Sequence, residues 1–223
     1  MISVIMSIYN NSTTLQDSID SILDQSFTDF EFLIIDDGST DNTQKILDQY
    51  RSNKKVRLFK NQKNIGLTKS LNILIDKAKG EYIARHDADD ISLKTRLEQQ
   101  LNFMKKYNLQ ISTSRAVKSN NKKLIPGISY YIPNKLVMKY KNPFIHGTLL
   151  IDTEILKRFR YDEEYYFSQD YELFTRLIKD YKIMTINKGL YILNVENNIS
   201  NKYKYEQNQD FLKAKNKFKS KYN

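Results

Sequence analysis

The chain has 223 residues, enough for one large domain with a substantial core. It has no cysteine, which excludes disulfide scaffolds and thiolate metal sites, and only six glycines and three prolines, which excludes a linker-dominated chain. A formal net charge of +10 points to an anionic partner, either a nucleic acid or a membrane surface. The apolar N-terminal run is short and lacks a basic flank, so it predicts a buried strand and not a signal peptide. No window approaches about 18 consecutive apolar residues, and the expected location is therefore the cytoplasm.

Apolar runs and helical patterns alternate in the first half of the chain. Strands are predicted by four apolar runs, at 2–8, 30–35, 56–59 and 81–85. Helices are predicted by apolar residues at helical spacing over 13–25, 41–51, 67–78 and 91–104. Thr13 and Gln16 predict a capping box at the start of the first of these helices. The alternation predicts an α/β fold with a mostly parallel, Rossmann-like sheet flanked by helices.

The second half is less regular. We expect a strand and a mobile loop within 108–141, a strand over 145–151 and a helix over 170–181. Two late strands are expected at 183–186 and 190–195. Residues 202–223 contain seven Lys and two acids, so they carry +5 of the net charge and predict a basic helical tail.

Acidic residues follow two of the predicted strands. Because the carboxyl ends of parallel strands meet at one edge of a sheet, Asp36-Asp37 and Asp87-Ala88-Asp89 should line one crevice. Asp87 and Asp89 are one residue apart, so both carboxylates can project the same way and share a hard cation such as Mg²⁺ or Mn²⁺. The alternative is that Asp89 or Asp90 caps the helix expected from residue 91.

Eight short motifs follow one another along the chain, at 4–10, 21–26, 31–41, 64–67, 80–85, 87–90, 142–148 and 169–176. They include Asp36-Asp37-Gly38-Ser39, Asn64-Ile65-Gly66, Asp87-Ala88-Asp89 and Gln169-Asp170. Their order resembles that of the family 2 glycosyltransferases, and the resemblance covers residues 1–195. It implies a GT-A fold and a metal-dependent, inverting transferase that uses a nucleotide sugar, with UDP as the expected nucleotide.

The resemblance also implies roles for individual residues. Donor-binding roles fall to Ser7, Tyr9, Asp36, Asp37, Asn64, Gly66, Arg85 and Asp87. Asp89 would hold Mn²⁺ or Mg²⁺ on the diphosphate, and Asp170 would be the catalytic base. His146 would either complete the metal shell or touch the acceptor, and Tyr166 and Gln169 would lie on the acceptor side.

Several side chains near these motifs have a structural alternative. Tyr161, Tyr165, Tyr166 and Phe167 precede Asp170, and they could stack on an acceptor sugar or pack against the sheet. His86 is expected to be a hydrogen-bonded strand histidine. Gln169 stands where the family often has Glu.

We divide the chain into a GT-A domain over 1–200 and a basic tail over 201–223. Within the domain, 1–107 is the nucleotide-binding half and 108–200 the acceptor-side half. The expected acceptor is a glycan or a lipid-linked sugar in cell-surface polysaccharide synthesis, with the Lys-rich tail on the inner face of an anionic membrane. The alternatives are a metal-dependent nucleotidyltransferase and a basic nucleic-acid-binding module; the second lacks any recognition motif, zinc spacing or Walker lysine, so no nucleic-acid partner is expected.

Overall fold

The computed structural model describes residues 1–195 and 204–219. The ends of the expected basic tail, 201–203 and 220–223, lie outside the described residues. The strands are β1 (Ile2–Ile8), β2 (Phe30–Asp36), β3 (Val56–Lys60), β4 (Tyr82–Arg85), β5 (Ile91–Ser92), β6 (Ile111–Lys118), β7 (Leu124–Ile125), β8 (Leu150–Asp152) and β9 (Ile183–Leu193). The α-helices are α1 (Leu15–Leu23), α2 (Thr43–Asp48), α3 (Leu67–Lys77), α4 (Arg96–Tyr107), α5 (Asn134–Met138), α6 (Thr153–Phe159), α7 (Gln169–Asp180) and α9 (Lys204–Lys219). Two 3₁₀ turns are η1 (Ile128–Tyr131) and η2 (His146–Thr148).

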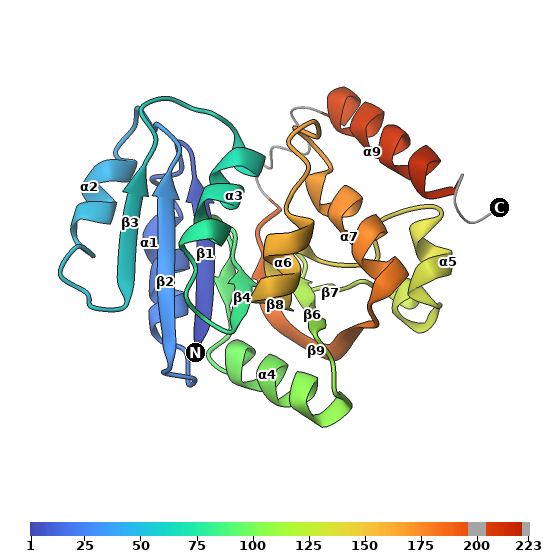
Figure 1. Ribbon diagram of the computed structural model, residues 1–223. Coiled ribbons are helices and arrows are strands. Elements are labelled where there is room, and N and C mark those ends of the chain that lie inside the picture. The colour runs from blue at the N-terminus through green and yellow to red at the C-terminus, as the bar shows by residue number, and fades with distance from the viewer. Residues whose placement is uncertain (196–203, 220–223) are drawn as a thin grey trace.

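One sheet runs through the molecule in the order β3-β2-β1-β4-β8-β6-β9-β5, and β7 pairs with β6 (Figure 1). The first four strands are parallel to one another, β8 is antiparallel to both of its neighbours, and β6 and β9 are again parallel. The predicted α/β fold, with its mostly parallel sheet, is confirmed. The carboxyl ends of β1, β2 and β4 therefore meet at one edge, as the strand-end motifs required.

Helices cover both faces of the sheet, and each face has its own hydrophobic cluster. Successive residues of a strand point to opposite faces, so Ile5 joins one cluster while Val4 and Met6 join the other. The first cluster includes residues of α3, α6, α7 and α9, and the second includes residues of α1, α2 and α4. This layering explains the buried pattern along all of β2.

Several predicted elements differ from the observed ones. The helix expected from residue 91 begins only at Arg96, because Ile91 and Ser92 form β5 against β9. The strand expected over 145–151 is divided into η2 and β8, and the two late strands are one strand, β9. The predicted capping box is wrong: Thr14 is the N-cap of α1, and no side chain caps the helix.

Helix α6 was not predicted. Its N-cap is Asp152, whose carboxylate accepts hydrogen bonds from the N–H groups of Glu154 and Ile155. The residue at the end of one element thus starts the next, and this pattern is hard to recognise within a short apolar run.

The C-terminal helix α9 packs against α7 (Figure 1). Ala214 and Phe218 are buried in the same hydrophobic cluster as α7, and the rings of Tyr171 and Phe211 lie 4.5 Å apart. Although α9 is Lys-rich, it is part of the packed core and not only a solvated basic face. Among the described residues, no helix is both long and apolar enough to cross a membrane.

Candidate active site

The turn after β2 is organised by Asp37, which is only 2% exposed. Its Oδ1 accepts hydrogen bonds from Asn61 Nδ2 at 2.7 Å and from Ile65 N at 3.0 Å, and its Oδ2 accepts one from Gly66 N at 2.9 Å. Asn64 Oδ1 accepts a second bond from Gly66 N at 3.0 Å. Two of the predicted donor-site motifs, from residues 37 and 64–66, are therefore joined in one hydrogen-bonded unit.

Two glycines allow this unit to close. Gly38 and Gly66 both have positive φ, at +77° and +93°. A Cβ atom on Gly38 would lie 2.6 Å from the backbone of Lys63, and one on Gly66 would lie 2.8 Å from the ring of Tyr166. Tyr166, which is 58% exposed, thus contacts the donor-side turn although it lies a hundred residues later in the sequence.

The ends of β1 and β2 are tied together beside this turn. Asn10 N donates to Ser39 Oγ at 3.0 Å, and Thr40 N donates to Asn10 Oδ1 at 2.8 Å. Asp36 accepts from Ser39 N at 2.9 Å, which closes the turn. Tyr9 follows the end of β1 and is 48% exposed, so its ring is accessible to a ligand. Ser7, the second-last residue of β1, is half-buried.

At the end of β4, Arg85 and Asp87 form an ion pair with Nη2 and Oδ1 2.5 Å apart. Arg85 is 2% exposed, whereas the Asp87 side chain is 26% exposed and reaches the surface. The Asp87 N–H donates to the Tyr191 hydroxyl at 3.0 Å. A Cβ atom on Gly147 would lie 2.7 Å from Asp87 Oδ2, so only glycine lets η2 pack against this carboxylate.

Asp89 and Asp90 do not cap a helix, because the N-cap of α4 is Thr95. The capping alternative is therefore wrong. Burial and the neighbouring charge of Asp87 raise the pKa of Asp89 to about 6, and burial with Asp87 and Asp89 raises the pKa of Asp90 to about 9. Asp90 Oδ1 also accepts a hydrogen bond from Asn194 N at 2.7 Å.

These acids crowd negative charge into one place, which a divalent cation would neutralise. Carboxylate oxygens are the ligands that Mg²⁺ and Mn²⁺ prefer, and Mg²⁺ sites often use only one or two carboxylates with substrate phosphates and water. Over residues 1–195 and 204–219, no group of three or more His, Asp or Glu side chains is arranged as a metal site. The chemistry of Asp87 and Asp89 therefore fits a cation that is held jointly with a bound diphosphate.

His86 is fully buried and hydrogen-bonded. Its Nε2 lies 2.9 Å from Ser18 Oγ, and its Nδ1 lies 3.2 Å from Ser92 Oγ. Burial, and then the charges of Arg96 and Arg85, hold the pKa of His86 well below its usual value. The prediction of a structural strand histidine agrees with this environment.

His146 lies in η2 with its Nε2 2.7 Å from the hydroxyl of Tyr161. Burial and Arg85 lower the pKa of His146, while Asp87 and Asp170 act in the opposite direction. The imidazole is therefore neutral at pH 7. Its neighbour Gly147 lies against Asp87 Oδ2, so η2 packs beside the acids that follow β4.

Asp170 is in the first turn of α7. Asn142 Nδ2 donates to Asp170 Oδ2 at 2.8 Å, and Phe144 N donates to Asn142 Oδ1 at 3.0 Å. The second bond sets the orientation of the Asn142 amide, so its NH₂ group faces the carboxylate. Gln169 is 8% exposed. Asp170 is thus a held but partly accessible carboxylate at a helix N-terminus, where negative charge is favoured.

Of the aromatic residues before α7, Tyr161 and Tyr165 are 3% and 1% exposed and belong to the first hydrophobic cluster. The packing alternative is correct for these two, whereas Tyr166 remains available to a ligand. Helix α9 holds this segment: Phe167 N donates to Asp210 Oδ2 at 2.8 Å, and Ser168 Oγ donates to the Gln207 carbonyl at 3.1 Å.

Three contributors to the site were not predicted. Arg96 is fully buried, and its Nη1 donates to the carbonyls of Arg85 and Gly147, which joins β4 to η2. Tyr191 supports the backbone of Asp87 from β9. Asn142 belongs to a motif noted in the sequence, but nothing local shows that its partner lies 28 residues away.

The topology of the sheet and the acids at its carboxyl edge define a GT-A domain of the kind that binds nucleotide sugars. The model of glycosyl transferase family 2 matches residues 3–174, and the chain belongs to this family. This membership supports the glycosyltransferase hypothesis over the nucleotidyltransferase and nucleic-acid-binding alternatives.

Several relatives resemble the chain along most of its length. The Bacillus subtilis protein EpsE, named as a glycosyltransferase, is 37% identical over 158 residues, which are 67% of this chain and 55% of EpsE. WfgD of Escherichia coli, a UDP-Glc:alpha-D-GlcNAc-diphosphoundecaprenol beta-1,3-glucosyltransferase, is 31% identical over 212 residues, which are 92% of this chain and 81% of WfgD.

Solved structures share the fold. S. aureus TarS 1–349 in complex with UDP-GlcNAc superimposes with a TM-score of 0.79 at 22% identity, covering 96% of this chain and 64% of that one. The mannosyltransferase PcManGT of Pyrobaculum calidifontis, in complex with GDP-Man and Mn²⁺, superimposes with a TM-score of 0.76 at 16% identity, covering 96% and 62%. The chain thus spans little more than half of EpsE and less than two thirds of these two structures.

Proposed function

We propose that this chain is a metal-dependent, inverting glycosyltransferase. It transfers a hexose-type sugar from a UDP-sugar donor to a hydroxyl of a glycan or a lipid-linked acceptor in cell-surface polysaccharide synthesis. The observation that carries the proposal is the packing of the segment before Asp170 on the donor-side turn: Tyr166 lies against Gly66, and Thr68 Oγ1 donates to the Tyr165 carbonyl at 3.0 Å. The UDP-sugar named for WfgD and the UDP-GlcNAc bound to TarS support the choice of donor.

On the donor side, the nucleotide would lie over the turn that Asp37 holds, beside the exposed ring of Tyr9. Asp89 would ligate Mg²⁺ or Mn²⁺ together with the diphosphate, and Asp87 would lie beside the sugar. When bound, the cation supplies Lewis-acid stabilisation of the charge that develops on the leaving diphosphate, worth several kcal/mol. The Mn²⁺ of PcManGT supports the choice of cation.

On the acceptor side, Asp170 would act as general base. Its carboxylate takes the proton of the acceptor hydroxyl while the hydroxyl oxygen forms a bond to the anomeric carbon. The bond from that carbon to the diphosphate breaks, and the nucleoside diphosphate leaves with the electron pair. Attack opposite the leaving group inverts the anomeric centre. Asn142 holds the carboxylate in place through its bond at 2.8 Å.

Replacing Asp170 by Asn tests this assignment. We expect the affinity for UDP with Mn²⁺, measured by calorimetry, to stay within about threefold, whereas sugar transfer falls roughly 10²–10⁴-fold, because general-base catalysis contributes that much. Asp180→Asn is the matched control, since Asp180 is exposed at the far end of the same helix. Transfer at the wild-type rate by Asp170→Asn would remove Asp170 from the base role.

A further inference from the structure

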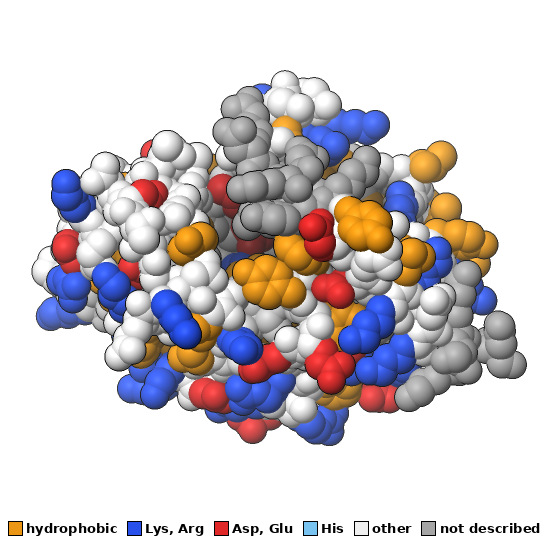
Figure 2. Space-filling view, turned by 90° about the horizontal axis from the view of Figure 1, so that it is seen from above, with side chains coloured by type: hydrophobic (Ala, Val, Ile, Leu, Met, Phe, Trp, Pro, Cys, Tyr) orange, Lys and Arg blue, Asp and Glu red, His pale blue; other side chains and the backbone are white. Residues whose placement is uncertain are grey.

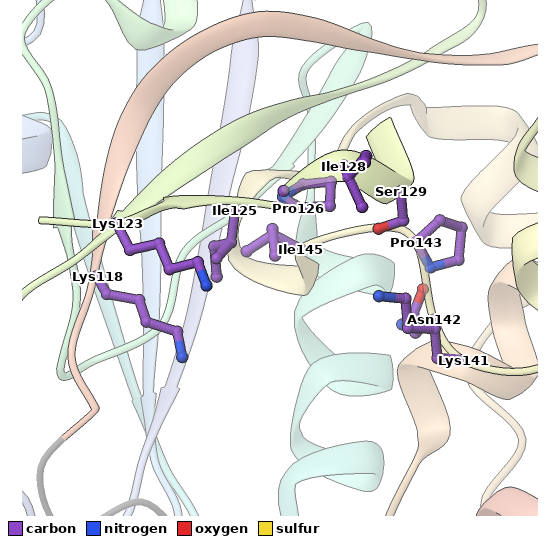
Figure 3. A pocket seen from close by; sticks show the side chains of 11 residues that line it. Lys118, Lys123, Ile125, Pro126, Ile128, Ser129, Lys141, Asn142, Pro143 and Ile145 are labelled. Atoms are coloured by element: carbon purple, nitrogen blue, oxygen red, sulfur yellow. The ribbon is translucent and has the colours of Figure 1, made fainter. Parts of the chain in front are cut away.

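A cavity of about 460 Å³ lies on the acceptor side of the site. Its lining comes from the ends of β6 and β7, from η1, and from the segment before η2, and it includes Asn142, the partner of Asp170 (Figure 3). Lys118, Lys123 and Lys141 are three of the lining residues. The volume is within the usual range for small-molecule sites, roughly 300–1,000 Å³.

This part of the chain is strongly basic. Between Glu98 and Asp152 the sequence has no Asp or Glu and nine Lys or Arg residues. None of Lys118, Lys123 and Lys141 forms an ion pair with a residue that the structure describes. Three ammonium groups around one cavity repel one another, and a bound anion would remove that cost. On the face of the molecule seen in Figure 2, Lys and Arg side chains are spread over the surface among acids.

A buried hydroxyl adds a second, independent indication of a ligand. Ser129 lines the cavity and is 6% exposed, and its Oγ has no hydrogen-bond partner. Buried polar atoms are almost always paired, so an unpaired one calls for a water, an ion or a ligand as its partner. A hydroxyl donor next to lysines suits a phosphate oxygen. Figure 3 shows the Ser129 side chain on the same side of the cavity as Asn142 and Pro143.

The position of the cavity relates it to the acceptor and not to the donor. The donor-side turns follow β1, β2 and β4, whereas the cavity adjoins Asn142 and therefore Asp170. A general base must reach the proton that it removes, so a group bound next to the base belongs to the acceptor. Near Lys118, the cavity also approaches the acids that follow β4. The N–H of Ser119, the next residue after Lys118, donates to the Leu193 carbonyl, and the following residue, Asn194, donates to Asp90.

We propose that this cavity binds a phosphate group of the acceptor, held by Lys118, Lys123, Lys141 and the hydroxyl of Ser129. The acceptor is then a phosphate-bearing glycan, whose free hydroxyl lies at Asp170. This inference rests on the proposed function. Ile128, which lines the cavity and is 86% exposed, favours a lipid-linked phosphate over a soluble one, as do the neighbouring Tyr131 at 72% and Tyr140 at 68%.

The test measures binding of inorganic pyrophosphate to the full chain by calorimetry in EDTA, so that no cation holds pyrophosphate at the acids of the donor site. We expect Lys118→Gln/Lys123→Gln/Lys141→Gln to weaken pyrophosphate binding at least tenfold, and Ser129→Ala to weaken it by several-fold. The control Lys54→Gln/Lys69→Gln/Lys105→Gln removes the same charge at exposed positions, and its affinity should stay within twofold.

The affinity for UDP with Mn²⁺ is measured on the same four proteins, so that a failure of the proposed function is seen separately. Equal pyrophosphate binding by the cavity variant and the wild type, or equal losses in the cavity and control variants, would overturn the inference. Sedimentation with phosphatidylglycerol vesicles then distinguishes the sources. Wild-type binding that pyrophosphate displaces supports a lipid-linked phosphate, and pyrophosphate binding without vesicle binding supports a soluble phosphorylated glycan.

Discussion

Replacement of Asp37 by Asn should destabilise the fold through the donor-side turn. The Asp37 carboxylate is 2% exposed and accepts three hydrogen bonds, two of them from the backbone N–H groups of Ile65 and Gly66. An Asn side chain has the same shape, but one of its two ends is an NH₂ donor. With the NH₂ group in place of Oδ2, the bond from Gly66 N is lost, although Gly66 N keeps its bond to Asn64 Oδ1. In the opposite orientation, the Ile65 N–H loses the acceptor that the carboxylate gives it.

The magnitude follows from these bonds. A hydrogen bond to a charged group contributes about 1.5–3 kcal/mol, and a buried unpaired donor costs about 1–3 kcal/mol. In the less costly orientation only the first of these costs applies, because Gly66 N stays bonded to Asn64 Oδ1, and the free energy of unfolding falls by about 1.5–3 kcal/mol. For a domain of this size, 1 kcal/mol shifts the melting temperature by about 2–4 °C, so the expected fall is roughly 3–12 °C.

The assay is thermal unfolding followed by circular dichroism at pH 7, with Asp180→Asn as control. The control replaces an exposed carboxylate and should shift the melting temperature by no more than about 2 °C, because surface substitutions change stability by about 0.5 kcal/mol or less. If Asp37→Asn also melts within about 2 °C of the wild type, these hydrogen bonds do not hold the turn, and our reading of Asp37 is incorrect.

Three further predictions concern the core, the pH dependence and the cation. Phe218→Ala should lower the free energy of unfolding by about 3–5 kcal/mol in urea titrations, because this side chain of α9 is 2% exposed. A loss no larger than that of an exposed control on the same helix, Asn216→Ala, would contradict the packing of α9. Burial raises the pKa of Glu31, but hydrogen bonds from Ser3, Arg57 and the Lys79 N–H outweigh it and hold the pKa below its usual value. Glu31 therefore stabilises the fold at neutral pH, and this contribution is lost as the pH falls from about 4.3 through the lower pKa of Glu31 in the folded chain. Glu31→Gln should thus be less stable than the wild type at pH 7, and the difference should shrink as the pH falls below about 4.3. Asp89→Asn should raise the Mn²⁺ concentration needed for half-maximal release of UDP at least tenfold, whereas undiminished turnover in EDTA would exclude the proposed cation.

Much of the N-terminal half could be predicted, because its signals are local. The apolar runs of β1, β2 and β4 and the spacing within α1 and α3 are each contained in fewer than about a dozen residues. Where a strand ends is also a local property. Since parallel strands share a carboxyl edge, the placement of Asp37 and Asp87 at the same edge of the sheet could be predicted from the alternation of strands and helices.

The second half depended on contacts between distant residues. Ile91 and Ser92 form a strand only because β9, about a hundred residues later, offers free backbone groups, and this pairing delays the start of α4. Asp90 and its partner Asn194 are likewise 104 residues apart in the sequence, as are Asp87 and Tyr191. No local pattern records which backbone or hydroxyl group will satisfy a buried carboxylate.

The net charge of +10 also has a local part, which the sequence shows, and a part that depends on contacts between distant residues. The sequence alone shows that the chain is basic, and it predicts that acids follow the strands, because composition and strand ends are local properties. The sequence pattern drew attention to the Lys-rich tail, yet α9 buries Ala214 and Phe218 against α7. Only the tertiary structure brought Lys118, Lys123 and Lys141 around one cavity beside Asn142, because these residues lie on separate segments that meet only when β6, β7 and the chain before η2 pack together.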